Sequence, residues 1–121
     1  MGAAYSGHAA VVLALAARGA DVNARADRGM APLQFACTDG HADLASELLR
    51  LGASVNAQAD DGTSALMEAA ENRDFDTLCV LLAAPGVDVN LVDEDGHTAL
   101  WHARFNGDAD IIGLLEFAGA R

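Results

Sequence analysis

The chain has 121 residues, of which 52% are hydrophobic but only 5% aromatic, and its formal net charge is −11 with no lysine. This length corresponds to one domain with enough apolar residues for a core, and no apolar run approaches the roughly 18–20 residues that a membrane span requires. Ten of the eleven net negative charges fall after residue 56. Such a surface repels nucleic acid and anionic membranes and favours basic partners, although solubility alone also explains most of the carboxylates.

The two cysteines, Cys37 and Cys79, are predicted to be small buried side chains in a reducing compartment. They fall at non-equivalent points of the repeating pattern described below, so we expect no disulfide framework. This cysteine usage favours a cytoplasmic protein.

The chain opens inside a repeating unit, because a Gly-His pair at residues 7–8 matches a second pair at residues 40–41. Residues 9–17 form an apolar run without a basic segment before it, which favours a helix of the repeat over the core of a signal peptide. Residues 1–26 are therefore predicted to be a partial N-terminal repeat. Because its first helix is absent or very short, apolar side chains would be uncovered here, and we expect self-association through this end.

Residues 27–59, 60–93 and 94–121 are predicted to be three further copies of one unit. A closing run Gly-Ala-x-Val-Asn, or a close variant, begins at Gly19, Gly52 and Gly86, and Gly119 starts another copy, at spacings of 33, 34 and 33 residues. Such a period indicates units that bury their apolar faces only by stacking on their neighbours.

Each unit is predicted to contain a turn, two helices and a loop. The first helices begin at Pro32, after Ser64 and after Thr98, because proline fits a first helical turn and the two hydroxyls can act as N-caps. The Gly-His pair at residues 40–41 separates the two helices of the first full unit. The second unit has residues 72–74 at this place, without a glycine.

The segments that connect successive units are here called finger one (residues 23–29), finger two (residues 56–62) and finger three (residues 90–96). Each combines Asn, Asp and Gly, which is the chemistry of tight hairpin-like turns. Stacking of the units should place fingers two and three side by side.

Several of these motifs together resemble the ankyrin repeat. The residues concerned are Asp21-Val22-Asn23-Ala24, Gly29, Ala31-Pro32-Leu33-Gln34, Ala36, Gly40-His41 and Leu48-Leu49, with Ser64-Ala65-Leu66-Met67 and Thr98-Ala99-Leu100-Trp101 as variants of the family's Thr-Pro-Leu-His motif. The resemblance implies an all-α fold, an ankyrin-repeat helical solenoid with short β-hairpin-like fingers, and a role in binding other proteins. Gln34, Met67 and Trp101 replace the motif's histidine, and for Met67 and Trp101 packing and partner contact are equal alternatives.

Catalytic and metal-binding patterns are missing from the sequence. It has no Gly-x-Ser-x-Gly elbow, phosphate-binding loop, His-Glu-x-x-His or Cys-x-x-Cys motif. The run Asp93-Glu94-Asp95-Gly96 resembles the start of a calcium loop, but the later ligands of an EF-hand do not follow, so we interpret it as a fingertip. We therefore expect no enzymatic activity, no metal site and no cofactor.

By the resemblance, the fingers and first helices would line one concave face that binds a protein. The candidate partner-binding residues on this face are Arg28, Met30, Asp60, Asp61, Thr63, Glu71, Glu94, Asp95, His97, Trp101 and Phe105. Because fingers two and three are acidic, we expect a basic protein partner, with Trp101 and Phe105 as apolar anchors and the charges setting orientation and association rate. The alternative is an architectural spacer segment of a longer ankyrin-repeat protein.

Overall fold

The computed structural model describes residues 23, 27–38 and 40–120 of the chain. In these residues a short 3-10 helix, η1 (Asp27–Gly29), precedes six α-helices. The helices form three pairs: α2 (Pro32–Thr38) with α3 (Ala42–Arg50), α4 (Ala65–Glu71) with α5 (Phe75–Leu82), and α6 (Ala99–Asn106) with α7 (Ala109–Phe117). The described part of the chain contains no strand, so the predicted all-α fold is confirmed.

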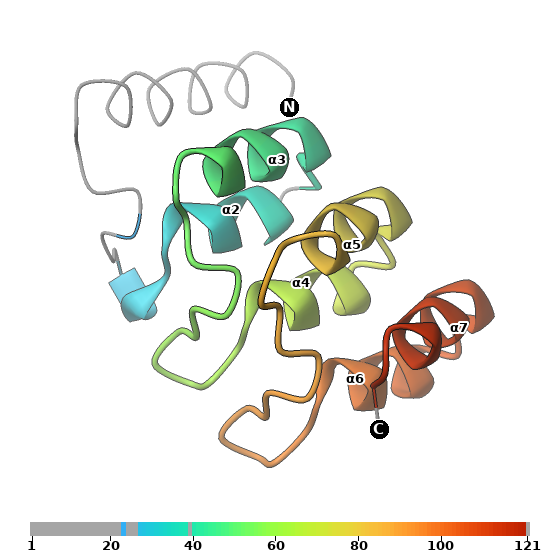
Figure 1. Ribbon diagram of the computed structural model, residues 1–121. Coiled ribbons are helices and arrows are strands. Elements are labelled where there is room, and N and C mark those ends of the chain that lie inside the picture. Colours follow the sequence, from blue (N-terminus) through green and yellow to red (C-terminus); the bar gives the residue numbers. More distant parts are fainter. Residues whose placement is uncertain (1–22, 24–26, 39, 121) are drawn as a thin grey trace.

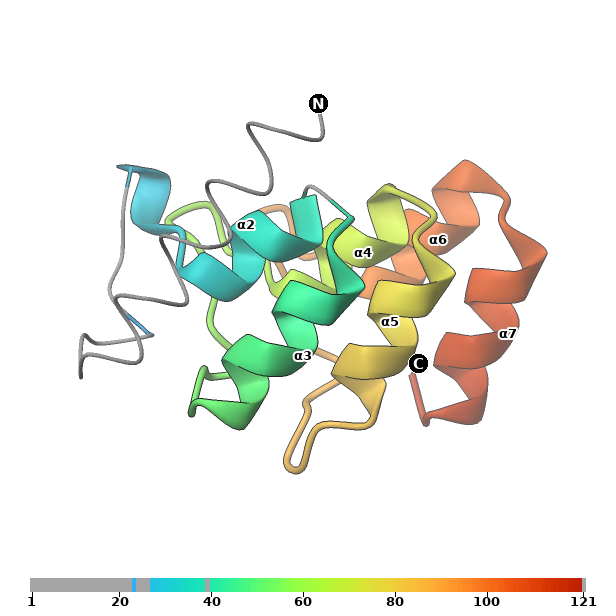
Figure 2. The ribbon, with the colours of Figure 1, turned by 90° about the horizontal axis from the view of Figure 1, so that it is seen from above.

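The three pairs stack side by side in two layers (Figure 1). Helices α2, α4 and α6 form what we call the inner layer, and α3, α5 and α7 form the outer layer, as the second view also shows (Figure 2). Each helix contacts its own partner and the equivalent helix of the next pair. The result is the helical solenoid that the resemblance implied, built from stacked units as the period indicated.

Side-chain caps fix where the short helices begin. The Ser64 and Thr98 hydroxyls each accept a hydrogen bond from the backbone N–H three residues on, at 3.3 and 3.1 Å, which confirms both predicted N-caps. The outer helices α5 and α7 begin in the same way on the carboxylates of Asp74 and Asp108. A cap of this kind contributes about 1 kcal/mol, which matters for helices too short to be stable alone.

The core lies between the two layers and between successive pairs. Buried alanines such as Ala45 and Ala69 let the helices approach closely. Burying one leucine stabilises the fold by about 1.5–3 kcal/mol, so packing between pairs holds the stack together. The largest buried apolar side chains are Leu33, Leu48, Met67, Leu78, Leu81, Leu100, Ile111 and Leu115.

The fingers are stacked loops joined through their backbones. The Asp60 N–H of finger two donates a hydrogen bond to the Arg28 carbonyl at 2.9 Å. The Glu94 N–H of finger three donates one to the Asp61 carbonyl at 2.8 Å. In the described residues the one strand-type pairing is an isolated bridge at the base of finger two. Fingers two and three therefore lie side by side, as expected (Figure 1).

The asparagines that close the repeats tie each pair to the next. The Asn56 side chain donates to the Gly86 carbonyl at 2.9 Å and accepts from the Asp88 N–H at 2.7 Å. Asn23 makes the same two kinds of contact one repeat earlier. An asparagine at this position satisfies both a carbonyl and an N–H of the next repeat, which explains why the residue returns with the period.

The second pair keeps its tight turn without a glycine. Arg73 adopts a left-handed φ of 57°, close to the 73° and 71° of Gly40 and Gly107 at the equivalent positions. A side chain in this conformation costs roughly 1–2 kcal/mol. The Arg73 guanidinium offsets part of that cost by donating to the Asn106 carbonyl at 3.2 Å.

Predictions about the cysteines and the N-terminal end have different outcomes. Cys37 is buried as expected, but the prediction for Cys79 is wrong, because this thiol is exposed beside the groove between α5 and α7.

The predicted self-association depends on the apolar run at residues 9–17, which lies outside the described residues, so it stays a prediction. Among the described residues, no helix combines the length and apolar composition needed to span a bilayer.

Candidate protein-binding surface

Gln34, Met67 and Trp101, which stand where the family's motif has a histidine, differ in their exposure to solvent. Gln34 is buried, accepts from the Ala31 N–H at 2.9 Å and donates to the Thr63 carbonyl of the next repeat. Met67 is also buried, so packing explains its presence. Trp101, in contrast, is 40% exposed. Of the three replacements, only Trp101 offers a large ring surface to a partner.

His97, Trp101 and Phe105 form a stacked series that we call the aromatic row. The His97 and Trp101 ring centroids are 3.5 Å apart with planes 2° from parallel, and the Trp101 and Phe105 centroids are 5.3 Å apart at 19°. A spacing of four residues places Trp101 and Phe105 on one face of α6, whereas His97 lies two residues before this helix and extends the row toward finger three. Phe105 is 78% exposed, so the row ends in an open ring.

His102 connects the aromatic row to carboxylates from two other parts of the stack. Its Nε2 lies 3.0 Å from the Asp93 carboxylate and its Nδ1 lies 3.3 Å from the Glu71 carboxylate. A neutral imidazole can donate to only one of them, whereas an imidazolium can donate to both. His102 also meets the Trp101 ring edge-on at 5.1 Å. No sequence pattern signalled this bridge, because its partners come from finger three and from the preceding inner helix.

Asp93 is a structural acid within finger three. Its Oδ1 accepts hydrogen bonds from the backbone N–H groups of Asp95 at 2.9 Å and His97 at 3.0 Å, and its Oδ2 faces His102. Burial by itself would raise the pKa of Asp93. The hydrogen bonds from His97, His102 and Asp95 more than offset burial, so the pKa of this carboxyl lies below its ordinary value.

Five residues line a hollow of about 260 Å³ that we call the α4–α6 hollow: Glu71, Trp101, His102, Phe105 and Asn106. Aromatic rings form much of its wall, and the Glu71 side chain, 52% exposed, supplies a carboxylate. Asn106 joins the two helices by donating to the Glu71 carbonyl at 3.0 Å. Three residues predicted from the sequence as partner contacts, Glu71, Trp101 and Phe105, therefore share one site.

The carboxylates at the tips of fingers two and three form a second feature of this surface. Asp60, Asp61, Glu94 and Asp95 are all exposed, and the backbone bond from Glu94 to Asp61 holds the two tips together. Hydrogen bonds from the Thr63 hydroxyl and N–H keep the pKa of Asp61 below its usual value. The two tips concentrate negative charge on neighbouring loops.

Residues 1–93 match a family model described as ankyrin repeats (3 copies). The chain belongs to the ankyrin-repeat family. Ankyrin repeats generally mediate protein–protein interaction, so the resemblance and the general class of function agree. Helices α6 and α7 lie beyond the matched residues and continue the same ankyrin stack. A search of the curated proteins found no match.

Three predicted contact residues lie near the first two fingers of the ankyrin stack and do not line the hollow. Arg28 is exposed with a left-handed φ of 63°, and Met30 is half-buried. Thr63 is also half-buried, and its carbonyl accepts from the Gln34 side chain and from the Ala59 N–H. These three residues therefore stay candidate contacts outside the aromatic site.

Finger three of the ankyrin stack also contains a group of possible metal ligands. Asp93, Asp95 and His97 each place one potential ligand atom within 4.8 Å of the others. However, the Asp93 oxygens accept backbone N–H groups and face His102, while the His97 ring stacks on Trp101. These contacts account for the cluster as the internal structure of the finger, and we propose no metal site there.

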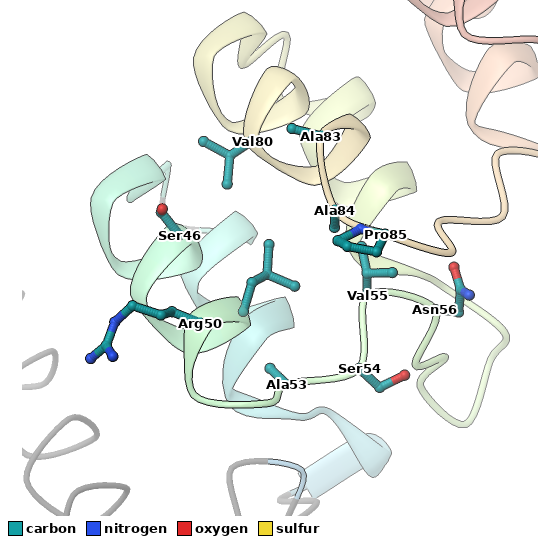
Figure 3. Close-up of a pocket in the computed structure, with 11 residues that line it drawn as sticks. Ser46, Arg50, Ala53, Ser54, Val55, Asn56, Val80, Ala83, Ala84 and Pro85 are labelled. Atoms are coloured by element: carbon teal, nitrogen blue, oxygen red, sulfur yellow. The ribbon is translucent and has the colours of Figure 1, made fainter.

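Besides an open hollow of about 500 Å³ lined by Phe75, Ala109, Asp110, Gly113 and Leu114, the outer layer of the ankyrin stack carries two further hollows. The larger, of about 570 Å³, lies between α3 and α5 and combines aliphatic side chains with Ser46, Ser54 and Asn56 (Figure 3). Its charged group, Arg50, pairs with Glu47. A mainly apolar groove of about 410 Å³ lies between α5 and α7. Among the described residues, neither lining includes a histidine or a carboxylate, so neither site offers acid–base chemistry.

Proposed function

We propose that the chain is a non-catalytic protein-interaction module of the cytoplasm that binds a basic protein through fingers two and three and helices α4 and α6. The observation that carries this proposal is the group of exposed carboxylates on two stacked fingers beside an exposed aromatic row. Exposed aromatic side chains are frequent energetic anchors of interfaces, and surrounding charges set orientation and association rate. The same charge disfavours nucleic acid and anionic membranes as partners.

The proximity of the acidic tips supports a basic rather than a neutral partner. Carboxylates held on adjacent loops repel one another, and a cationic surface relieves that repulsion when it binds. At physiological salt the field of exposed charges is screened over about 8 Å, so the electrostatic part of binding should weaken as salt is added. Salt-dependent association is therefore the expected property of the interaction.

An architectural spacer within a longer ankyrin array is the second candidate. Support comes from Phe117 at the end of α7, which is 92% exposed, because a neighbouring repeat covers apolar side chains of this kind in a solenoid. A spacer has no need of charged fingertips, so variants of the fingers separate the two candidates.

The test is to capture a partner at low salt and measure its association rate with wild type and with a triple variant, Asp60→Asn, Glu94→Gln and Asp95→Asn. Asp61 is left unchanged because its carboxylate accepts the Thr63 N–H and shapes the finger. We expect association at low salt to slow about tenfold and its salt dependence to flatten, since rim charges act mainly on encounter.

The matched control removes the same charge from the outer layer through Asp43→Asn, Asp76→Asn and Asp110→Asn, three exposed carboxylates in first helical turns. This variant should bind at nearly the wild-type rate. If the finger variant also associates at the wild-type rate at low salt, the acidic fingers serve only solubility and the proposed function is wrong.

A further inference from the structure

We propose that the α4–α6 hollow binds an arginine side chain of the partner. This inference rests on the proposed function, because it names the chemistry that the same surface recognises. The hollow is smaller than the roughly 300–1,000 Å³ of typical small-molecule pockets. At about 260 Å³ it suits a single side chain rather than a helix or a cofactor.

The hollow pairs open aromatic surface with a carboxylate. Phe105 ends the aromatic row with an exposed ring, and Trp101 stands beside it at 5.3 Å. A cation within about 6 Å of such a ring is attracted by its negative face. The half-exposed Glu71 carboxylate lines the same hollow and adds a charged acceptor.

The nearby arginines of the chain already have partners other than the Glu71 carboxylate. The Arg73 guanidinium donates to the backbone carbonyl of Asn106 at 3.2 Å, and the Arg104 guanidinium pairs with Glu116 at 2.8 Å. His102 approaches only one oxygen of Glu71, at 3.3 Å. The other oxygen of this carboxylate can therefore accept from an incoming side chain.

The local field also favours a positive charge. Glu68, one turn before Glu71, has a pKa raised by burial, and the carboxylates of Glu71 and Asp61 add to the effect. A further negative charge would therefore find an unfavourable environment here. A cationic partner side chain lowers the mutual repulsion of these acids.

Arginine fits this combination better than lysine. Its guanidinium is planar, so it can lie flat on the Phe105 ring while its edge donates to the Glu71 carboxylate. A lysine ammonium is a compact, strongly hydrated charge that cannot stack in this way. A purely apolar side chain would leave the Glu71 carboxylate desolvated without a donor, which is costly.

The test uses capped pentapeptides with four glycines around a central arginine, lysine or citrulline, followed by NMR and by the emission of Trp101, the one tryptophan of the chain. Citrulline keeps the shape of arginine but has no charge. We expect the arginine peptide to shift resonances of Trp101, Phe105 and Asn106. It should bind about tenfold more tightly than the citrulline peptide, a difference of about 1.4 kcal/mol, and more tightly than the lysine peptide.

Two single variants should remove this preference. Phe105→Ala removes the open ring and Glu71→Gln removes the carboxylate charge, and each should weaken arginine binding about threefold to tenfold. Both side chains are largely exposed, so the fold should survive. Phe117→Ala and Asp76→Asn are matched controls on exposed residues of the outer layer and should leave the preference intact.

The outcomes separate this inference from the proposed function. Equal binding of the arginine and citrulline peptides, shifts confined to residues outside the hollow, or lysine binding as tightly as arginine would each overturn the arginine site. The finger variant described above should retain the preference for arginine over citrulline. If that preference is absent while the finger variant still slows partner association, the arginine site is wrong and the proposed function stands.

Discussion

Replacing Gly62 by alanine should damage the stacking of the fingers, whereas the same change at Gly96 should not. The two glycines occupy equivalent positions in fingers two and three and have nearly the same left-handed φ, 84° and 80°. A Cβ on Gly62 would lie 2.8 Å from the Asp93 Cα and 2.9 Å from the Glu94 nitrogen, which are backbone atoms of the next finger. A Cβ on Gly96 would meet no atom within 4 Å.

The expected magnitudes follow from separating conformational strain from the collision. An alanine in the left-handed region costs roughly 1–2 kcal/mol, and about 0.4–1 kcal/mol of this is offset because alanine restricts the unfolded chain. Both variants share this net loss. Gly62→Ala adds overpacking against backbone that cannot rotate away, which typically costs about 1–3 kcal/mol. The difference between the two variants should therefore be about 1–3 kcal/mol.

Urea denaturation followed by circular dichroism and by Trp101 fluorescence measures this difference. With a slope of about 2 kcal/mol per molar, the Gly62→Ala midpoint should lie about 0.5–1.5 M below that of Gly96→Ala. Gly29→Ala should fall between them, because its Cβ would meet mainly the flexible Asp60 side chain. Equal midpoints for Gly62→Ala and Gly96→Ala would refute the close packing of finger three on finger two.

Two further predictions concern titratable groups of the inner and outer layers. In native protein a thiol reagent should modify only the exposed Cys79 rapidly, because Cys37 is buried and because burial and the neighbouring Glu68 and Asp74 carboxylates raise the pKa of its thiol. Cys79→Ser should therefore abolish the fast phase of modification. Fast labelling of Cys37 would contradict its burial. Burial also raises the pKa of the Glu68 carboxyl above its ordinary value of 4.5, although the hydrogen bond from Thr38 opposes this shift. The contribution of Glu68 to folding stability is therefore greatest below pH 4.5 and is lost as the pH rises through the raised pKa. Glu68→Gln should therefore stabilise the protein relative to wild type at pH 7 but not at pH 4 in urea titrations, and a difference independent of pH would disprove this assignment.

The helical pairs were predictable because their signals are local. The period of the closing glycines placed the units, and the hydroxyls of Ser64 and Thr98 cap α4 and α6 as expected from their position before apolar residues. The turn at Arg73 was harder to predict, since the second unit has no glycine at this place. The stack keeps the left-handed conformation there with an arginine, because the helices on both sides hold the turn in place.

The candidate site was predictable only in part. Glu71, Trp101 and Phe105 could be proposed from their repeat positions, and the structure places them in one hollow. The bridge through His102 could not be foreseen, because it depends on distances between residues of different repeats. The exposure of Cys79 was mispredicted for a related reason, since the apolar pattern of α5 does not reveal how much of it α7 covers.

The sequence by itself determined where helices begin, where the chain turns and where acidic residues cluster, because caps, turn residues and charge act over a few neighbouring positions. Only the tertiary structure decided which of those groups are available to a partner. Gln34, Met67 and Trp101 occupy one repeat position, yet two are buried and one is exposed, because coverage depends on what packs against each helix. Asp93 and Asp95 are two residues apart in finger three, yet hydrogen bonds occupy the first carboxylate while the second stands in solvent. The packing of one repeat on the next decides the first case, and the folding of finger three against His102 decides the second.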